Sequence, residues 1–319
     1  MMDFRIHFGE WIESGLNWVS TNLDWFFTLM RSVYLGMYDS VNWVFNTPPV
    51  AAVIIVVAIA ALLARGWKFG LGTAAGLLFI LGVDQWENAM DSLSLVLVSA
   101  FLAIIISIPI GIWAARNAVV SAIVKPIMDF LQTMPALVYL IPAIALFRIG
   151  VAPGIFATVL FALAPGVRLT ELGIRGVDHE VVEAGHAFGA SPGRILRQIQ
   201  LPLAMPSIMA GINQIIMLSL SMVVIAGFVG AGGLGGEVTK ALSALDKPLG
   251  FDAGMAVVIL AIILDRFTGA FGNKRAKSLM SGLADRLPSG GSDDDARDTT
   301  DGEDMDQMVD ENRATRAAP

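Results

Sequence analysis

Long apolar runs separated by short polar stretches make up most of the chain after residue 48. A helix needs about 20 mostly apolar residues to cross the hydrocarbon core of a bilayer. The pattern therefore predicts an all-α polytopic membrane protein with about seven transmembrane helices. The predicted spans are Pro49–Ala64, Phe69–Val83, Ser92–Ala115, Phe130–Phe147, Val151–Val167, Ala204–Gly230 and Ala253–Phe271. Because the first two runs fall short of that length, a tilted or re-entrant hairpin is the alternative to two crossings.

Residues 1–47 have a different pattern, in which bulky apolar side chains alternate with polar and charged ones. Four of the seven Trp lie here, at positions 11, 18, 25 and 43. Trp is enriched where a membrane meets water, and helices with one apolar face lie in that plane. We therefore predict an amphipathic interfacial segment. A loosely ordered extension is the alternative.

Composition supports the membrane assignment. Hydrophobic residues make up 55% of the chain, charged residues 15%, and the mean hydropathy is +0.68. The net charge of −7 comes from the end of the chain, where residues 287–319 hold ten acidic side chains against three Arg. Such a segment buries too little apolar surface to offset the entropy of ordering it. We divide the chain into the interfacial segment 1–47, two short spans in 48–84, a core in 85–275 and an acidic disordered tail in 276–319.

Lys and Arg are distributed unequally between the two sides of the predicted spans. With the N-terminus outside, the inner segments carry twelve basic residues and the outer segments five. Because cytoplasmic loops of membrane proteins carry an excess of Lys and Arg, this orientation is favoured. It places the acidic tail and the polar loop 168–203 in the cytoplasm.

The longest polar interruption between apolar runs is Asp178–Pro202, and its residues predict two short helices joined by a tight elbow. Gly189 suits the left-handed position that ends a helix. Ser191 as N-cap and Pro192 at the first helical position begin the next helix, which stops at Pro202. On the first helix, an apolar face is predicted at Val181, Ala184 and Phe188.

This segment resembles the EAA loop of ABC importer permeases, whose pattern is Glu-Ala-Ala, three residues, Gly, nine residues, Ile, one residue, Leu-Pro. The chain keeps that spacing and departs from it only in having Gly185 in place of the second Ala. The resemblance implies a coupling helix that docks in a groove of a separate cytoplasmic ATPase. The residues implied in ATPase coupling are Glu183, Ala184, Gly185, Phe188, Gly189, Ser191, Pro192, Ile199, Leu201 and Pro202. An ordinary helical hairpin between two spans is the alternative.

Two further stretches, Asp129–Pro142 and Leu218–Val229, resemble permeases for glycine betaine and related quaternary amines. Pro135 and Pro142 free backbone carbonyls, which is tolerated where neighbouring helices or a water-lined path satisfy them. Polar side chains in these spans are therefore candidates for the translocation path, and hydrogen bonding between helices is an equally open role. The candidates are Gln132, Thr133, Tyr139, Asn213, Gln214, Ser219 and Ser221.

Three other patterns have less specific interpretations. Residues 230–235 spell G-x-G-x-x-G, but they follow a predicted span instead of a strand, so a closely packed turn is expected and not a dinucleotide site. Asp265 and Arg266 are expected to form an ion pair, with a gating role as the alternative. His179 and His186 share a helix face without a third ligand, and the chain has no Cys, so we expect no metal site.

The resemblance to ABC importers also implies partners. They are two copies of a cytoplasmic ATPase, a substrate-binding protein on the outer side, a second copy of this chain and the lipid of a bacterial inner membrane, with no nucleic acid. The implied core of five helices is of the type I importer class. Since the chain has no phosphate-binding loop, ATP and Mg are expected in the ATPase, and no cofactor or catalytic residue is expected here.

The substrate class implied is glycine betaine, proline betaine or a related quaternary amine. Choline, carnitine, an amino acid or another small solute is the nearest alternative. An ATP-independent secondary transporter and a membrane-anchored scaffold acting through the acidic tail are the competing classes.

Overall fold

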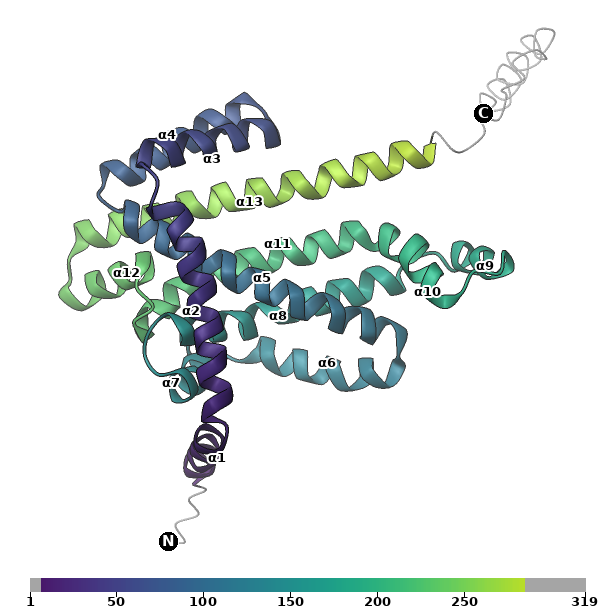
Figure 1. Cartoon of the computed structure of the whole chain (residues 1–319), viewed down its shortest axis with the longest axis horizontal. Coiled ribbons are helices and arrows are strands. Elements are labelled where there is room, and N and C mark those ends of the chain that lie inside the picture. Colours follow the sequence, from purple (N-terminus) through teal and green to yellow (C-terminus); the bar gives the residue numbers. More distant parts are fainter. Residues whose placement is uncertain (1–6, 285–319) are drawn as a thin grey trace, which may run out of the picture. The chain divides into compact units, whose positions relative to one another are not determined.

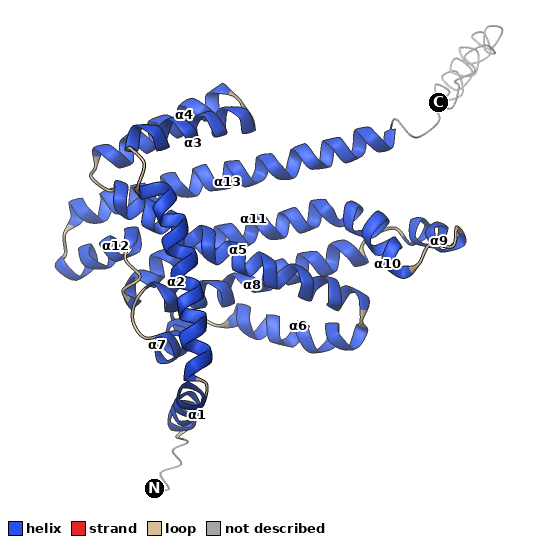
Figure 2. Ribbon diagram, viewed as in Figure 1, coloured by secondary structure: helices blue, strands red, loops and turns tan. Residues whose placement is uncertain are grey.

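The computed structural model describes residues 7–284, and within that range the regular elements are all helices (Figure 2). The predicted all-α fold is confirmed. Figure 1 labels the α-helices: α1 (Phe8–Asn22), α2 (Asp24–Asn46), α3 (Val50–Arg65), α4 (Trp67–Gly82), α5 (Trp86–Arg116), α6 (Ala118–Thr133), α7 (Leu140–Phe147), α8 (Val151–Arg175), α9 (His179–Ala187), α10 (Pro192–Ile195), α11 (Leu201–Ala226), α12 (Gly233–Ala244) and α13 (Lys247–Ala284). Two 3₁₀ turns, η1 (Ala136–Tyr139) and η3 (Gly227–Val229), and one π-helix, η2 (Leu196–Gln200), connect them.

Four helical segments in the described range are long and apolar enough to cross a membrane: α5, α8, the continuous segment Pro192–Val229, and α13 as far as Ala270. Two bent pairs, α2 with α3 and α6 with η1 and α7, raise the number to six if each is one span. The expected seven exceeds this range because α4, counted as a separate crossing, has only 16 residues. At about 1.5 Å per residue such a helix covers roughly 24 Å, which is less than the hydrocarbon core.

The predicted span Phe130–Phe147 is not one helix. Helix α6 begins earlier than expected, at Ala118, and ends at Thr133; the chain then bends by 110° into η1 and α7. The break falls at Met134, whose extended backbone (ψ 132°) precedes Pro135. A residue before proline is pushed out of the helical region by the proline ring, and the apolar run across positions 130–147 concealed that effect.

Helices α5, α8 and α11 form the centre of the described fold and run side by side (Figure 1). Small residues allow their close approach. A side chain at Gly111 of α5 would overlap Thr170 of α8, and one at Gly166 of α8 would overlap Ser107 of α5 and Ile215 of α11. Since membrane helices gain little from hydrophobic burial against each other, close van der Waals packing of this kind holds them together.

Helices α3 and α4 form a hairpin that turns at Gly66, where φ is +98°. Gly70 approaches Leu62 across the hairpin so closely that a Cβ would lie 2.9 Å from its Cβ atom. Buried side chains of the hairpin, including Ile54 and Ile80, pack with Leu260 of α13. The predicted second segment is therefore a helical hairpin.

Residues 7–47 form two helices. Helix α2 packs on the core through Tyr34, whose ring lies 5.6 Å from that of Phe147, and through Asn42, whose Nδ2 donates to Asp91 Oδ1 of α5 at 2.6 Å. The four indoles at positions 11, 18, 25 and 43 are exposed. Two helices with exposed Trp match the predicted pattern, and their location at a membrane surface stays a prediction. The tail after residue 284 lies outside the described residues, and residues 276–284, assigned to it from the sequence, belong to α13.

The glycine-rich stretch after α11 is a closely packed turn, as expected. Gly230 ends η3 in the left-handed conformation, and Gly232 has φ +77°. A Cβ at Gly227 would fall far inside contact distance of the Gly235 carbonyl group. Backbone therefore meets backbone at this point, and α12 is held directly against the end of α11.

Candidate functional site

The polar loop contains the predicted elbow. Helix α9 begins after Asp178, whose carboxylate accepts from the Glu180 N–H at 2.9 Å. It ends at Ala187, and Gly189 follows with φ +74°. A positive φ is strained for residues with a side chain, so Gly189 fixes the direction of the chain between the two helices. Ser191 and Pro192 then begin α10 as predicted, although the Ser191 hydroxyl makes no capping hydrogen bond.

The helices at both ends of the loop are longer than the sequence pattern suggested. Helix α8 continues eight residues beyond the predicted span, from Val167 to Arg175, and Glu171 and Arg175 pair one turn apart on this extension. The second loop helix does not stop at Pro202 but passes through η2 into α11. Pro202 has no N–H to donate to the helix, but little is lost, because the π-helix η2 has already interrupted the regular hydrogen-bond pattern before it.

The two faces of α9 have different surroundings. Gly185 is buried against α10 and η2, where a Cβ would lie 2.8 Å from Ile199 Cδ1 and 3.4 Å from Ile195 Cγ1. Val181, Ala184 and Phe188, the predicted apolar face, point away from the chain, and the Phe188 side chain is 91% exposed. An apolar patch on a short protruding helix is a characteristic interaction surface.

Glu183 lies beside this apolar face and is largely exposed. Its Oε1 is 3.2 Å from Nδ1 of His179, one turn earlier on α9. Exposed pairs of this kind contribute little to stability. The Glu183 carboxylate is thus free to meet a partner, whereas Gly185 and Ile199 hold the elbow closed from within.

We expect Gly185→Ala to be tolerated. The nearest obstacle is the tip of the flexible Ile199 side chain, which can move by a few tenths of an ångström, so the cost should stay below about 1 kcal/mol. Gly185→Leu should displace α9 from Ile195 and Ile199 and lower the melting temperature. Thermal unfolding of both variants in detergent checks this; an equal loss for Ala and Leu would contradict the packing described.

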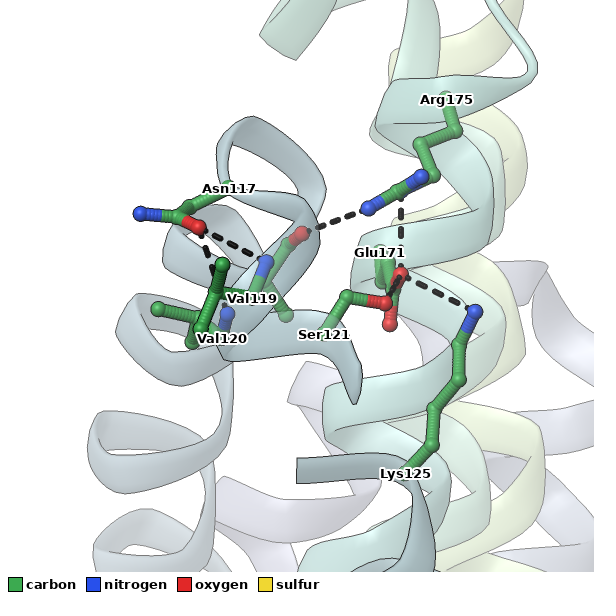
Figure 3. A network of polar contacts seen from close by, with 8 residues as sticks. Asn117, Val119, Val120, Ser121, Lys125, Glu171 and Arg175 are labelled. Atoms are coloured by element: carbon green, nitrogen blue, oxygen red, sulfur yellow. Dashed lines mark hydrogen bonds and ion pairs between the residues drawn. The ribbon is translucent and has the colours of Figure 1, made fainter. Parts of the chain in front are cut away.

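A buried carboxylate lies where α8 enters the loop (Figure 3). Glu171 Oε1 accepts from Ser121 Oγ of α6 at 2.7 Å and lies 3.0 Å from Arg175 Nε and 3.5 Å from Lys125 Nζ. The Arg175 guanidinium also donates to the Ala114 carbonyl of α5 at 2.9 Å. Sequence reasoning missed Glu171. The available signal was its spacing of four from Arg175, but its burial depends on α6 lying against α8.

The path candidates do not come together as one lining. Gln132, Thr133, Gln214 and Ser221 are exposed. Tyr139 is buried, and its hydroxyl donates to the Leu131 carbonyl across the break after α6. Ser219 is also buried, and its hydroxyl has no partner among the described residues. Their role in a path stays a prediction.

Asn213 bonds between helices. Its amide donates to Asp265 Oδ1 of α13 at 3.5 Å, and its carbonyl oxygen accepts from Thr268. The expected pair of Asp265 with Arg266 is wrong, since neighbouring residues of a helix do not face each other. In residues 7–270, no cluster of three or more His, Asp or Glu could hold a metal ion.

Residues 107–277 match the family of binding-protein-dependent transport system inner membrane components. The match runs from within α5 into α13 and includes the elbow, the Glu171 network and the glycine-rich turn. The chain belongs to this family.

Relatives with described roles match over most of the chain. The glycine betaine/carnitine transport permease protein GbuB of Listeria monocytogenes is 47% identical over 86% of this chain and 98% of its own length. The glycine betaine/proline betaine permease ProW of Escherichia coli is 44% identical over 80% and 74%. The glycine betaine permease OpuAB of Bacillus subtilis is 44% identical over 83% and 94%.

Solved structures support the fold. An inward-facing structure of the MetNI methionine ABC transporter aligns with 61% of this chain and 95% of its own chain, with a TM-score of 0.53 and 23% identity. A second crystal form of the same transporter aligns with a TM-score of 0.51 and 22% identity. The helical core of this chain therefore has the same fold as a chain of that ABC transporter.

Proposed function

We propose that this chain is the membrane-spanning permease subunit of an ATP-driven importer for glycine betaine, proline betaine or a related quaternary amine. The observation that carries the proposal is identity of 44–47% to three glycine betaine permeases over at least 80% of the chain. The exposed apolar face of α9 adds a surface for an ATPase. The complex would contain two copies of the chain, two ATPases that hold ATP and Mg, and a substrate-binding protein.

The proposed coupling residues are the ten loop residues from Glu183 to Pro202 named from the sequence, of which Gly185 and Ile199 would act by holding the elbow closed. Phe188 and Val181 would enter the ATPase surface, Glu183 would offer a charge at its edge, and Gly189 would set the angle. The orientation proposed has the N-terminus outside and α9 in the cytoplasm of a cell with this chain in its inner membrane. The chain itself would perform no covalent chemistry.

Substrate selectivity is proposed to lie mainly in the binding protein. Quaternary ammonium groups are commonly recognised by several aromatic faces around the cation. Tyr139, the one Tyr among the path candidates, is buried with its hydroxyl on Leu131. A weakly selective route through the permease follows, and choline, carnitine or an amino acid is the next solute to compare.

Uptake of glycine betaine into proteoliposomes that contain the permease, its ATPase and its binding protein tests the proposal. We expect uptake only when ATP is present on the side of the membrane that carries the ATPase, and only when the binding protein is present. If choline or carnitine stimulates ATP hydrolysis and glycine betaine does not, the proposed substrate is wrong and the assignment to the ATP-driven importers stands. Uptake without nucleotide would contradict the class and favour a secondary transporter.

A further inference from the structure

We infer that Glu171 is a positioning residue that makes helix α6 follow displacements of the coupling loop. The inference rests on the proposed function, since it concerns how an ATPase acting on α9 would reach the membrane helices. Glu171 lies on α8 and is neither one of the ten proposed coupling residues nor one of the path candidates.

The first support is burial. Among residues 9–270, whose side chains the structure describes, Glu171 is the one charged residue that is buried, with 6% of its side chain exposed. An ionised carboxylate in such a place is stable only when hydrogen-bond donors and opposite charges surround it. Removing donors is therefore costly, and the contacts around Oε1 hold their partners in one arrangement.

The second support is which helices supply the donors. Ser121 and Lys125 lie one turn apart on α6, and both contact Glu171 Oε1, so α6 is held at two points. Arg175, on α8 itself, contacts the same oxygen and extends to the Ala114 carbonyl, in the last turn of α5. Such carbonyls lack partners within their helix. The carboxylate thus joins α6 to α8, and Arg175 extends the network to the end of α5 (Figure 3).

The third support is position along the chain. Arg175 is the last residue of α8, and α9 begins four residues later at His179. A displacement of α9 therefore reaches the Glu171 network before any other contact between α8 and α6. Elsewhere the packing between α6 and α8 is mainly apolar, through Met128 of α6 and Leu163 and Val167 of α8, and apolar contacts are less directional than the bonds of a hydrogen-bonded carboxylate.

A nearby pair provides a matched control. Arg168 and Asp129 also join α8 to α6, but both side chains are substantially exposed, at 39% and 67%. An exposed ion pair contributes little. Asp129→Asn removes a charge from the same helix interface without disturbing the buried carboxylate.

The test combines Ser121→Ala with Lys125→Met, which cuts the link to α6 and leaves Glu171 paired with Arg175. The complete complex in proteoliposomes should still hydrolyse ATP, while glycine betaine moved per ATP falls by about fivefold or more. Asp129→Asn should stay within about twofold of the unmodified complex, and Lys125→Arg, which keeps the cation, should restore the ratio in the Ser121→Ala background. An unchanged ratio in the double variant would overturn the inference.

A second measurement does not depend on the solute. Because the chain has no Cys, pairs of introduced cysteines can carry spin labels at exposed sites: Gly193→Cys on the loop or Ile123→Cys on α6, each with Val258→Cys on α13. Trapping the ATPase with ATP should change both distances in the otherwise unmodified complex, and only the loop distance in the double variant. That result would support the inference even if the complex transports no betaine. The absence of betaine transport would contradict only the proposed substrate. An α6 distance that stays fixed in the otherwise unmodified complex while the loop distance changes, or that changes equally in the double variant, would overturn the inference.

Discussion

Phe188→Ala should weaken ATPase binding by roughly 30-fold or more and reduce ATP-driven uptake accordingly, while the permease itself folds and melts as before. The Phe188 ring is 91% exposed in the described chain, and its removal costs no contact within the fold. If the ring is buried in a partner, truncation at such an anchor costs about 2–4 kcal/mol, or roughly 30-fold or more in affinity. The direction of the ring is fixed by Gly189 and by the packing of Gly185 behind it.

Phe251→Ala is the matched control. Phe251 lies on α13 and is 78% exposed, so its loss removes a similar apolar area from a different surface. Binding of the purified ATPase, measured by co-purification and by titration in detergent, should weaken for Phe188→Ala and stay unchanged for Phe251→Ala. Equal binding by both variants would show that the face formed by Val181, Ala184 and Phe188 is not the docking surface.

Gly227→Ala should give the largest loss of stability. The added methyl group would meet the Gly235 carbonyl and the Gly236 N–H, which are backbone atoms that cannot rotate away. Overpacking costs typically 1–3 kcal/mol, and we expect the upper limit, about 3 kcal/mol, because both obstacles are main chain. That corresponds to a decrease in melting temperature of roughly 6–12 °C.

Gly254→Ala on α13 separates this effect from a general cost of replacing glycine. No atom lies within 4 Å of a Cβ built there, and its φ is not positive. Since Ala favours a helix over Gly by up to about 1 kcal/mol, this variant should melt at the same temperature or slightly higher. Thermal unfolding of both variants in one detergent decides the matter; a Gly227→Ala protein as stable as the unmodified chain would refute the close backbone contact.

The sequence predicted those parts of the fold that depend on local pattern. The long apolar runs of α5, α8 and α11 were found, and the elbow at Gly189 followed from the conformational preference of glycine. The break at Met134 was missed because hydropathy does not register the steric effect of Pro135 on the residue before it. The burial of Glu171 was missed for a different reason, since it requires Ser121 and Lys125, about 50 positions earlier, to lie across from it.

The predicted site divides in the same way. Spacing selected the ten loop residues, whose part in coupling stays a prediction, and the structure gives three of them distinct environments: Gly185 is inside the elbow, Phe188 is outside and Glu183 is at the edge. Residue type alone did not identify a path, because helix rotation decides whether a polar group faces another helix, as Asn213 does, or lies buried, as Ser219 does. That rotation depends on packing between helices, which a single sequence does not encode locally.

The continuity of the loop with α11 has a mechanical consequence. From Pro192 to Val229 the chain is helical for 38 residues, which at about 1.5 Å per residue is a rod of roughly 57 Å. One end of this rod carries the contacts beneath α9, and the other is fixed by the meeting of Gly227 and Gly235. A displacement of the loop would therefore reach the glycine-rich turn through one continuous helical segment, and the π-helix η2 and Pro206, both near the loop, are the points at which that segment can bend.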